Sequence, residues 1–462
     1  MDKIIDKIKG ALKTGDVLTG DDVHSRSAGS WGSPGNIRAK AIVRPETTEE
    51  VSAVLRICSE AGQSIVTHGG LTGVVQGAIA EENDIVLSLE LMNEIEEIDK
   101  VNRTATVQAG VVLQSLQEAA RDEGLMMPLD LGARGSCTIG GNIATNAGGV
   151  SVMRYGMMRE STLGLEVVLA DGTVLSSMNQ MIKNNAGYDL KHLFIGSEGT
   201  LGVVTRAVVR LREAPTSQNT AFVALDDFDK AAKLLKLVDG LSGGTLHAFE
   251  LFWHDFYILV STPPAQAAAP LSYEFPYYVL IETQGSHQEA DAERFQNMLE
   301  TAMQHDLIAD AAIAQTAKER ATMWEMRDDV QQLWQYEPMF MFDVSLPIPE
   351  MNNYMQEVDK NLSKTWPLFE FFAFGHLADG NLHLAVSAGE DDAETTKIVN
   401  ECVYAPLKKI GGSISAEHGI GMEKKDYLKY SRTPEELALM QALKKTLDPK
   451  RILNPGRVFD LE

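Results

Sequence analysis

The sequence is poor in cysteine and lacks any long hydrophobic run. Its three cysteines, Cys58, Cys137 and Cys402, are odd in number and widely spaced, which excludes a disulfide framework and favours a reducing compartment. No apolar stretch reaches the roughly 18 residues that a membrane-spanning helix needs. The first residues match neither a secretory signal nor a mitochondrial transit peptide. We therefore expect a cytoplasmic protein without a transmembrane segment.

Positive charge is scarce as well, because 41 Lys and Arg residues stand against 65 Asp and Glu residues, a formal net charge of −24. Such a surface repels nucleic acid and anionic lipid, so we expect neither as a partner. A small anionic substrate would need a local positive centre, such as an arginine or a metal ion. The length of 462 residues and the 44% hydrophobic content predict two or three globular domains.

Glycine is unevenly distributed, which marks two kinds of domain. Glycines crowd the region 62–202 and are sparse in 213–374. The first part reads as short strands and helices, with Thr47 and Glu50 as a capping box at one helix start. The second part suggests an antiparallel sheet with helices on one face. The predicted class is α+β, with an N-terminal helix and arm (1–38), a first domain (39–213), a second domain (214–410) and a C-terminal segment (411–462) that returns to the first.

The usual nucleotide-binding signatures are absent, because the sequence has no G-x-G-x-x-G motif and no Gly-Lys pair. Two glycine-rich clusters stand in their place, at 68–73 and 135–149. Backbone without side chains can cradle a pyrophosphate, and Ser136, Thr138 and Asn146 offer further hydrogen-bonding groups. The alternative is that these glycines only form tight turns, but their density disfavours it.

Several longer stretches resemble the FAD-binding domain of the vanillyl-alcohol-oxidase type, and within it the D-2-hydroxyacid dehydrogenase branch. They include HGGLTG, PLDLGARGSCTIGGNIATNAGG and YDLKHLFIGSEGTLGVVT. The resemblance runs from Ala39 to Phe459 and implies FAD, a small 2-hydroxy acid substrate and a homodimer. In flavoproteins of this fold, a histidine after the double glycine can bond covalently to the flavin. Leu71 takes that place here, so we expect FAD to be held without a covalent bond.

The resemblance assigns FAD-binding roles to several loops. Gly69, Gly70, Thr72 and Gly73 would form one pyrophosphate loop, and Glu198 would lie by the adenosine part. The full set of expected cofactor-binding residues is Pro45, His68, Gly69, Gly70, Leu71, Thr72, Gly73, Pro128, Gly132, Ser136, Cys137, Thr138, Gly140, Gly141, Asn142, Thr145, Asn146, Gly149, Glu198, Gly199, Val204 and Asn454.

A histidine pair lies on either side of Asp379-Gly380. Asp-Gly between apolar strands predicts a two-residue hairpin turn, which would place His376 opposite His383. Opposed residues share one face of the sheet with Cβ atoms about 5 Å apart, a separation at which two imidazoles can chelate one metal ion. The alternative is a solvent-facing or stacked pair without a metal.

The neighbouring residues Glu417 and His418 stand in a second glycine-rich turn. Taken alone, the two residues are compatible with a surface turn that has no function. Together with the hairpin, they supply an oxygen ligand and a base. The resemblance implies the same assignment, with His376, His383 and Glu417 as metal ligands and His418 as the catalytic base. Such a set leaves open coordination sites for substrate. Zinc is the expected metal, with manganese or iron as alternatives.

The resemblance identifies Arg327 as the arginine that binds the substrate carboxylate, and a bidentate guanidinium suits that anion. The alternative is a helix-surface arginine paired with Asp328 or Gln331. In the expected reaction the metal lowers the pKa of the α-hydroxyl group, His418 accepts its proton and a hydride passes to flavin N5. The electrons would then pass to a quinone or an electron-transfer protein.

Three positions depart from the pattern of the 2-hydroxyglutarate enzymes, which carry Lys near Met341, Thr at Gln331 and Asn at Ala385. Met341 and Ala385 cannot hold a distal carboxylate, so a D-lactate-like monocarboxylate is favoured. Oxidation of D-2-hydroxyglutarate remains an alternative. An oxidase, or a non-catalytic FAD-binding subunit of a larger complex, are the other readings.

Overall fold

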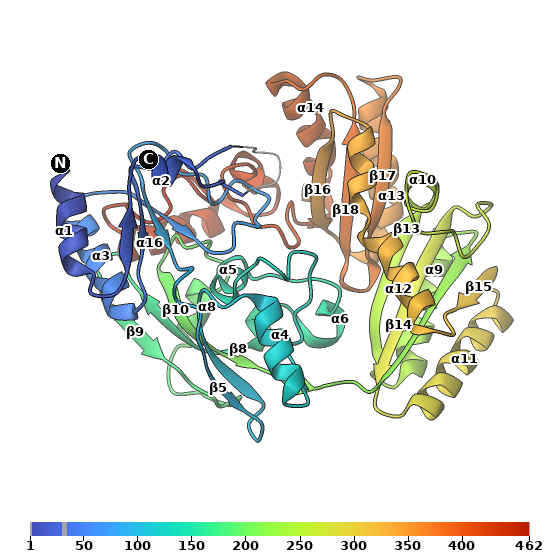
Figure 1. Cartoon of the computed structure of the whole chain (residues 1–462). Coiled ribbons are helices and arrows are strands. Elements are labelled where there is room, and N and C mark those ends of the chain that lie inside the picture. Colours follow the sequence, from blue (N-terminus) through green and yellow to red (C-terminus); the bar gives the residue numbers. More distant parts are fainter. Residues whose placement is uncertain (1, 30–34, 462) are drawn as a thin grey trace. The chain divides into compact units, whose positions relative to one another are not determined.

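The computed structural model describes residues 2–29 and 35–461 (Figure 1). The chain divides into two compact units, each of which is described by itself. The first comprises 1–149, 155–214 and 417–462, and the second comprises 150–154 and 215–416. The change at residue 214 lies one residue from the expected boundary, whereas the return to the first unit comes six residues later than 411. Residues 30–34 of the expected N-terminal arm lie outside the described residues.

The first unit contains a mixed four-stranded sheet of order β1-β2-β4-β3. Strands β2 (Ala41–Arg44), β3 (Ile65–His68) and β4 (Ile85–Ser88) are parallel, and β1 (Asp16–Leu18) is antiparallel to β2. Helix α3 (Thr48–Ala61) connects β2 to β3. It ends at Gly62, whose φ of +66° gives the left-handed conformation that terminates helices.

The expected capping box at the start of α3 is only half formed. The Thr47 hydroxyl accepts a hydrogen bond from the Glu50 backbone N–H at 3.2 Å, as predicted. The Glu50 carboxylate, however, accepts from the backbone N–H groups of Lys13, Thr14 and Glu46, at 2.6, 2.8 and 2.9 Å. Burial raises the pKa of this carboxyl group, but these backbone donors outweigh burial and lower it to about 2. Glu50 therefore ties the N-terminal segment to the first sheet.

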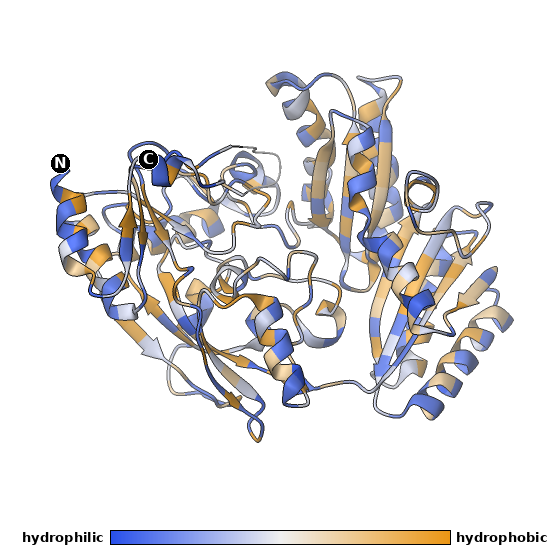
Figure 2. Ribbon diagram, viewed as in Figure 1, coloured by the Kyte–Doolittle hydropathy of each residue, from blue (hydrophilic) through white to orange (hydrophobic). Residues whose placement is uncertain are grey.

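A second sheet in the first unit is antiparallel, with the order β5-β6-β10-β8-β9. Its strands are β5 (Ile95–Asp99), β6 (Thr104–Gln108), β8 (Thr162–Val168), β9 (Val174–Ser177) and β10 (Val203–Arg210). The smaller elements of this unit are α1 (Lys3–Ala11), α2 (Asp21–His24), α4 (Leu113–Asp122), β7 (Leu125–Met126), α5 (Ile139–Thr145), α7 (Met158–Ser161), α8 (Lys191–Phe194), β11 (Arg212–Glu213), η4 (Lys425–Tyr430) and α16 (Pro434–Leu447). Helix α6 (Val152–Tyr155) lies mostly in the segment 150–154, which belongs to the second unit. One apolar core joins both sheets, and hydrophobic residues follow their strands (Figure 2).

The second unit is built on a seven-stranded antiparallel sheet of order β15-β12-β14-β13-β17-β18-β16. Its strands are β12 (Ser217–Leu225), β13 (Leu246–Trp253), β14 (Tyr277–Gly285), β15 (Asp310–Ile313), β16 (Phe340–Ser345), β17 (Glu370–His376) and β18 (Asn381–Ser387). Its helices are α9 (Phe228–Ser242), α10 (His254–Leu259), α11 (Gln288–Gln304), α12 (Ala317–Asp328), η1 (Val330–Gln335), η2 (Ile348–Glu350), α13 (Met351–Ser363), η3 (Leu377–Asp379), α14 (Ala393–Tyr404) and α15 (Leu407–Ile410).

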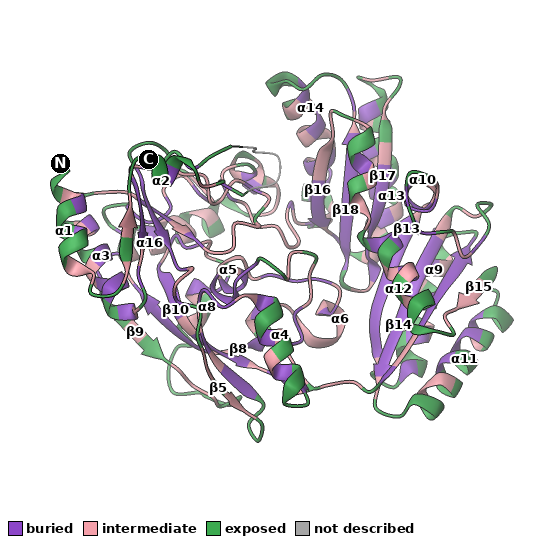
Figure 3. Cartoon of the chain, in the orientation of Figure 1, coloured by how far each residue is buried: buried purple, intermediate pink, exposed green. Residues whose placement is uncertain are grey.

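The central strands of this sheet are buried at nearly every position (Figure 3). One face packs in a cluster that includes Phe222, Phe252, Phe256 of α10 and Met326 of α12. Helices α9 and α11 contact the same strands but contribute no residue to that cluster. The predicted antiparallel sheet is present, but helices cover both of its faces rather than one. Continuous burial follows, because each face must exclude water.

The hairpin that carries the histidine pair differs from the predicted one. Leu377–Asp379 forms a short 3₁₀ turn that ends at Gly380, whose φ is +81°. The longer connection shifts the pairing, so that Phe374 rather than His376 lies opposite His383. The predicted register is therefore wrong by two residues. Because side chains alternate with a period of two, an even shift leaves both histidines on the predicted face.

Candidate active site

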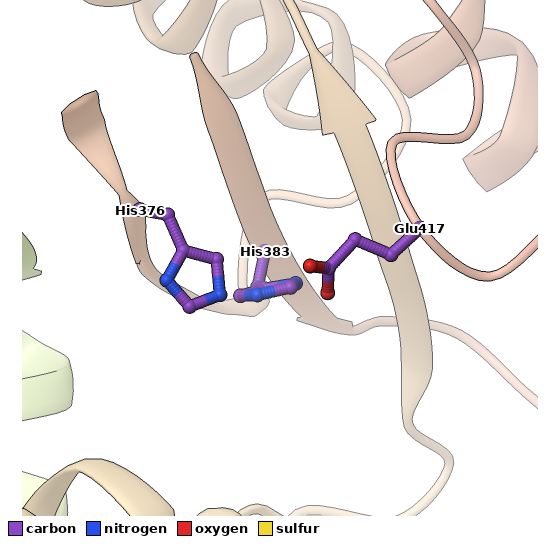
Figure 4. A group of neighbouring side chains, drawn as sticks. All are labelled: His376, His383 and Glu417. Carbon is purple, nitrogen blue, oxygen red and sulfur yellow. The ribbon is translucent and has the colours of Figure 1, made fainter. Parts of the chain in front are cut away.

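Three potential metal ligands converge in the structure. His376 ends β17, His383 lies in β18, and Glu417 follows directly on Ala416, the last residue of the second unit. Each offers one ligand atom, and these atoms all lie within 4.8 Å of one another (Figure 4). Both histidines are buried, which contradicts a solvent-facing pair. Two imidazoles and one carboxylate form a ligand set that suits a catalytic divalent cation.

His376 is held by two charged groups on other elements. Its Nδ1–H donates to Glu250 of β13 at 2.7 Å, and its Nε2 lies 3.2 Å from Nη2 of Arg327. The Nε–H of Arg327 donates to the second Glu250 oxygen at 2.7 Å. Burial raises the pKa of Glu250, but His376 and Arg327 outweigh it and lower that pKa to about 2. The three groups therefore form a buried network around an ionised carboxylate.

Arg327 is buried, with 8% of its surface exposed, so the reading as a helix-surface arginine is wrong. Its guanidinium carbon lies 5.1 Å from the centre of the Phe374 ring, a cation–π distance. Together with the Glu250 bond, this contact fixes the plane of the guanidinium. An arginine fixed in this way can present its remaining N–H groups to an anionic ligand.

Asp343 orders the other side of the cluster. It lies opposite His383 in the β16–β18 pair, with Oδ1 at 3.6 Å from Nδ1 of His383. Its fully buried carboxylate also accepts hydrogen bonds from Asn381 Nδ2 at 2.8 Å and from the Ala416 backbone N–H at 3.1 Å. The same carboxylate thus contacts one proposed ligand and anchors the backbone immediately before Glu417.

His418 lies in the C-terminal part of the first unit, which begins one residue earlier at Glu417. Two residues further on, the backbone N–H groups of Ile420 and Gly421 donate to the buried Glu198 carboxylate at 2.7 and 2.8 Å. Burial raises the pKa of Glu198. In the structure the Glu198 carboxylate holds the turn after His418, and its predicted place by the adenosine part of FAD stays a prediction.

The two glycine-rich loops of the first unit pack backbone against backbone. A Cβ added at Gly70 would collide with the Ser136 carbonyl oxygen and lie 2.7 Å from the Cys137 Cα, and one at Gly69 would lie 3.5 Å from the Gly141 Cα. Gly73 and Gly132 have no atom within 4 Å of the corresponding position. Some glycines thus allow the loops to meet, while others leave the open backbone that a cofactor can approach.

The remaining predicted cofactor residues of the first unit lie around these loops. His68 is buried, its Nε2–H donates to the Ala78 carbonyl at 2.8 Å, and burial lowers its pKa to about 4. Asn454 accepts from the Thr67 backbone N–H at 2.8 Å and donates to the Glu198 carbonyl at 2.6 Å. These contacts connect the end of β3 with the 196–200 turn and the C-terminal segment.

The other positions are ordered by local structure. Leu71, Asn146, Gly149 and Glu198 have positive φ angles, as does Gly199. Ser136 and Cys137 precede Thr138, which caps α5, and that helix contains Gly140, Gly141, Asn142 and Thr145. Val204 lies in β10, Pro45 follows β2 and Pro128 follows β7. Thr72 follows Leu71. Burial raises the pKa of Cys137, which suits a packing role rather than a reactive thiolate.

Glu250 and Asp343 are absent from the residues predicted from the sequence, although the sequence around each contains a signal. Each is a single carboxylate inside an apolar strand, in LHAFELFW and MFMFDVS respectively. A lone acidic residue at a fully buried strand position almost always has a partner, because burying an unpaired charge is costly. That signal marks both residues as candidates without naming their partners.

Comparison with known proteins identifies the family. Residues 39–177 match the model of the FAD binding domain, and 214–458 match that of the FAD linked oxidases, C-terminal domain. The chain belongs to the FAD-linked oxidase family, with FAD as its cofactor. It is an FAD-dependent oxidoreductase that acts on CH–OH groups. Among the described residues, no helix has the length and apolar character needed to cross a membrane.

Several named relatives align over most of the chain. The mitochondrial D-2-hydroxyglutarate dehydrogenase of Danio rerio is 38% identical over 97% of this chain and 84% of its own. The D-2-hydroxyglutarate dehydrogenase of Stutzerimonas stutzeri (strain A1501) is 36% identical over 99% and 98%. Among solved structures, p-cresol methylhydroxylase superposes with a TM-score of 0.77 at 19% identity, covering 99% of this chain and 97% of its own. The fold is thus of the vanillyl-alcohol-oxidase type, as expected.

Proposed function

We propose that the protein is an FAD- and divalent-metal-dependent dehydrogenase of D-2-hydroxy acids, with His376, His383 and Glu417 holding the ion. The observation that carries the proposal is the convergence of three ligand atoms within 4.8 Å beside a buried arginine. Zinc suits two imidazoles and a carboxylate, and manganese or iron are the alternatives. When bound, FAD supplies the hydride acceptor and the ion polarises the hydroxyl oxygen.

The protein's own groups would divide the remaining work. Arg327 binds the carboxylate common to all 2-hydroxy acids, because its guanidinium is fixed by Glu250 and Phe374. His418 accepts the proton of the α-hydroxyl group as general base. Its position next to a proposed ligand, in a turn held by Glu198, supports this role.

The glycine-rich loops of the first unit would hold FAD without a covalent bond. Leu71 stands where covalent flavoproteins of this fold carry histidine, and a leucine side chain cannot form such a bond. The open backbone at Gly73 and Gly132 supports approach of the pyrophosphate. Acid denaturation should release intact FAD into the supernatant, and flavin that remained with the precipitated chain would contradict this part of the proposal.

The proposed substrate is a D-lactate-like monocarboxylate. Met341 and Ala385 lie directly opposite each other, two residues from the Asp343–His383 pair and on the same face. Both belong to, or pack against, the apolar cluster that contains Phe372. Neither side chain can donate a hydrogen bond to a second carboxylate. D-2-hydroxyglutarate remains the second candidate, because relatives at 36 and 38% identity carry its name.

The partners and surroundings are further proposals. The electrons pass from the flavin to a quinone or an electron-transfer protein, since the relatives are named dehydrogenases. The active form is a homodimer, and the protein works in the cytoplasm. The three cysteines are free in the structure, which supports a reducing compartment.

Anaerobic reduction of the bound flavin tests the function. Metal-depleted and zinc-reconstituted protein would be mixed with D- and L-2-hydroxy acids while flavin absorbance is followed. We expect bleaching with D-enantiomers only, and only after zinc, manganese or iron is restored. Rapid reduction of rigorously metal-free protein would contradict the metal, and no reduction by any 2-hydroxy acid would contradict the substrate class.

A further inference from the structure

We propose that Glu250 is a positioning residue that sets two groups of the proposed site at once. It fixes the proton of His376 on Nδ1, which leaves Nε2 available as a ligand, and it fixes the direction of the Arg327 guanidinium. The inference rests on the proposed function for the roles of His376 and Arg327. The contacts of Glu250 itself are independent of that function.

The sheet places Glu250 between these partners. Glu250 lies directly opposite His376 in the β13–β17 pair, so both side chains project from the same face. Oε1 is 2.7 Å from Nδ1 of His376, and Oε2 is 2.7 Å from Nε of Arg327. Only 1% of the Glu250 surface is exposed, so water does not compete for these bonds. The carboxylate therefore bridges a strand and helix α12 in a dry environment.

The hydrogen bond decides which imidazole nitrogen can bind a metal. Glu250 accepts a hydrogen bond from the positively charged Arg327 guanidinium, which favours its carboxylate form. A carboxylate is only an acceptor, so Nδ1 of His376 must carry the proton. The lone pair then lies on Nε2, and one ring nitrogen of His376 points toward His383 and the Glu417 carboxylate (Figure 4). Carboxylates that hold a ligating histidine in this way typically change metal affinity by about 10- to 100-fold.

The second oxygen acts on substrate binding. It accepts a hydrogen bond from the Nε–H of Arg327, and the centre of the Phe374 ring lies 5.1 Å from the guanidinium carbon. These two contacts stop the guanidinium from rotating. Nη2 also lies 3.2 Å from Nε2 of His376, so the remaining terminal N–H groups are the ones left for an anion. Without Glu250 the arginine would lose its charge partner and its fixed plane, so substrate binding should weaken more than the chemical step.

Glu250→Gln tests this role, and Glu282→Gln is its matched control. Glu282 is also a buried carboxylate, on the neighbouring strand β14, where it accepts hydrogen bonds from Thr220 and Trp324 at 2.8 Å each. It makes no hydrogen bond with His376 or Arg327 in the described structure. Zinc affinity would be measured on the full FAD-loaded protein by competition with a chromophoric chelator, together with KM and kcat for the best D-2-hydroxy acid.

We expect Glu250→Gln to weaken zinc binding about 10- to 100-fold and to raise KM about tenfold. With saturating zinc, kcat should fall less than KM rises. The FAD content should stay unchanged, and Glu282→Gln should change zinc affinity and KM less than about twofold. Equal losses in both variants would overturn the inference, because they would reflect general damage to the sheet. Unchanged zinc affinity and KM in Glu250→Gln would overturn it as well.

A measurement without metal separates this inference from the proposed function. ¹⁵N NMR of histidine-labelled, metal-free protein reports the tautomer of His376. We expect the Nδ1–H form in the unmodified protein and a loss of that preference in Glu250→Gln. Should the glutamine variant fail to fold, Glu250→Asp keeps the charge but shortens the reach, and it should show a smaller change in the same direction. If the unmodified protein binds none of zinc, manganese and iron, the metal proposal fails, and the tautomer still decides the role of Glu250.

Discussion

Glu50 in the first unit and Glu250 in the second are both buried carboxylates whose pKa is lowered to about 2, yet different partners hold them. The backbone N–H groups of Lys13, Thr14 and Glu46 donate hydrogen bonds to Glu50. The side chains of His376 and Arg327 donate hydrogen bonds to Glu250. The first arrangement fastens one segment of chain to another. The second arrangement orients side chains that can take part in the chemistry.

The same contrast extends to the binding positions of the two units. In the first unit they are backbone positions, where glycine or a positive φ lets loops meet or stay open. In the second unit they are side chains fixed on strands by buried charge. Substitutions in the first unit should therefore act through loop shape and FAD retention. Substitutions in the second should act through metal and substrate binding.

The largest expected effect is the loss of a histidine ligand. His376→Ala or His383→Ala should abolish bound metal and lower kcat/KM at least about 1,000-fold, because an imidazole ligand and its place in the buried network are lost. FAD content and the flavin spectrum should stay nearly unchanged. Metal analysis, flavin absorbance and steady-state kinetics on the same preparations check this. Loss of FAD together with the metal would break the contrast between the two units.

Substitution by alanine at two glycines of the first unit should affect protein stability differently. Gly70→Ala places a methyl group against the Ser136 carbonyl, so it should cost about 1–3 kcal/mol or more of folding free energy and expel FAD. Gly73→Ala meets no atom within 4 Å and should leave the stability of the FAD-free protein unchanged. Thermal unfolding and FAD titration of both variants separate the effects. Equal destabilisation would show that the two loop positions do not differ as described.

The preference between monocarboxylic and dicarboxylic substrates tests whether side chains of the second unit select the substrate. We expect D-lactate or D-2-hydroxybutyrate to reduce the flavin with kcat/KM about tenfold or more above that of D-2-hydroxyglutarate. The reason is that Met341 and Ala385 provide no charge-assisted contact, which is worth roughly 1.5–3 kcal/mol. Met341→Lys should narrow or reverse the preference. Stopped-flow reduction measures each rate, and a tenfold advantage of D-2-hydroxyglutarate in the unmodified protein would contradict the argument.

The sequence predicts the histidine pair and the glycine loops better than it predicts what holds them. Asp379-Gly380 correctly indicates a turn, and an even register shift leaves His376 and His383 on one face although the predicted turn is too short. The partners of Glu250 lie 77 and 126 residues away along the chain. Such long-range pairs depend on strand order, which a single sequence does not encode in any local pattern. The same reason explains the half-formed capping box, where Lys13 and Thr14 compete successfully for Glu50.

The smallest expected effect on catalysis comes from the carboxylate of the first unit, which acts on the pH dependence of folding. The pKa of Glu50 falls from 4.5 in the unfolded reference to about 2 in the folded state, so its ionised form stabilises the fold. That contribution is complete above about pH 5 and is lost as the pH falls from 4.5 toward 2. Each pKa unit corresponds to about 1.4 kcal/mol, so the contribution at neutral pH is at most about 3.5 kcal/mol.

Glu50→Gln isolates this contribution, because glutamine keeps the shape but turns an NH₂ group toward backbone donors. The stability difference between the unmodified protein and the variant should be largest near pH 7 and should shrink between pH 4.5 and 2. Urea unfolding followed by fluorescence at several pH values measures it, and kcat/KM of the folded variant should stay near that of the unmodified protein. A pH-independent difference would show that Glu50 acts through packing rather than through its charge. A loss of kcat/KM as large as that of Glu250→Gln would mean that the two carboxylates do not serve different purposes.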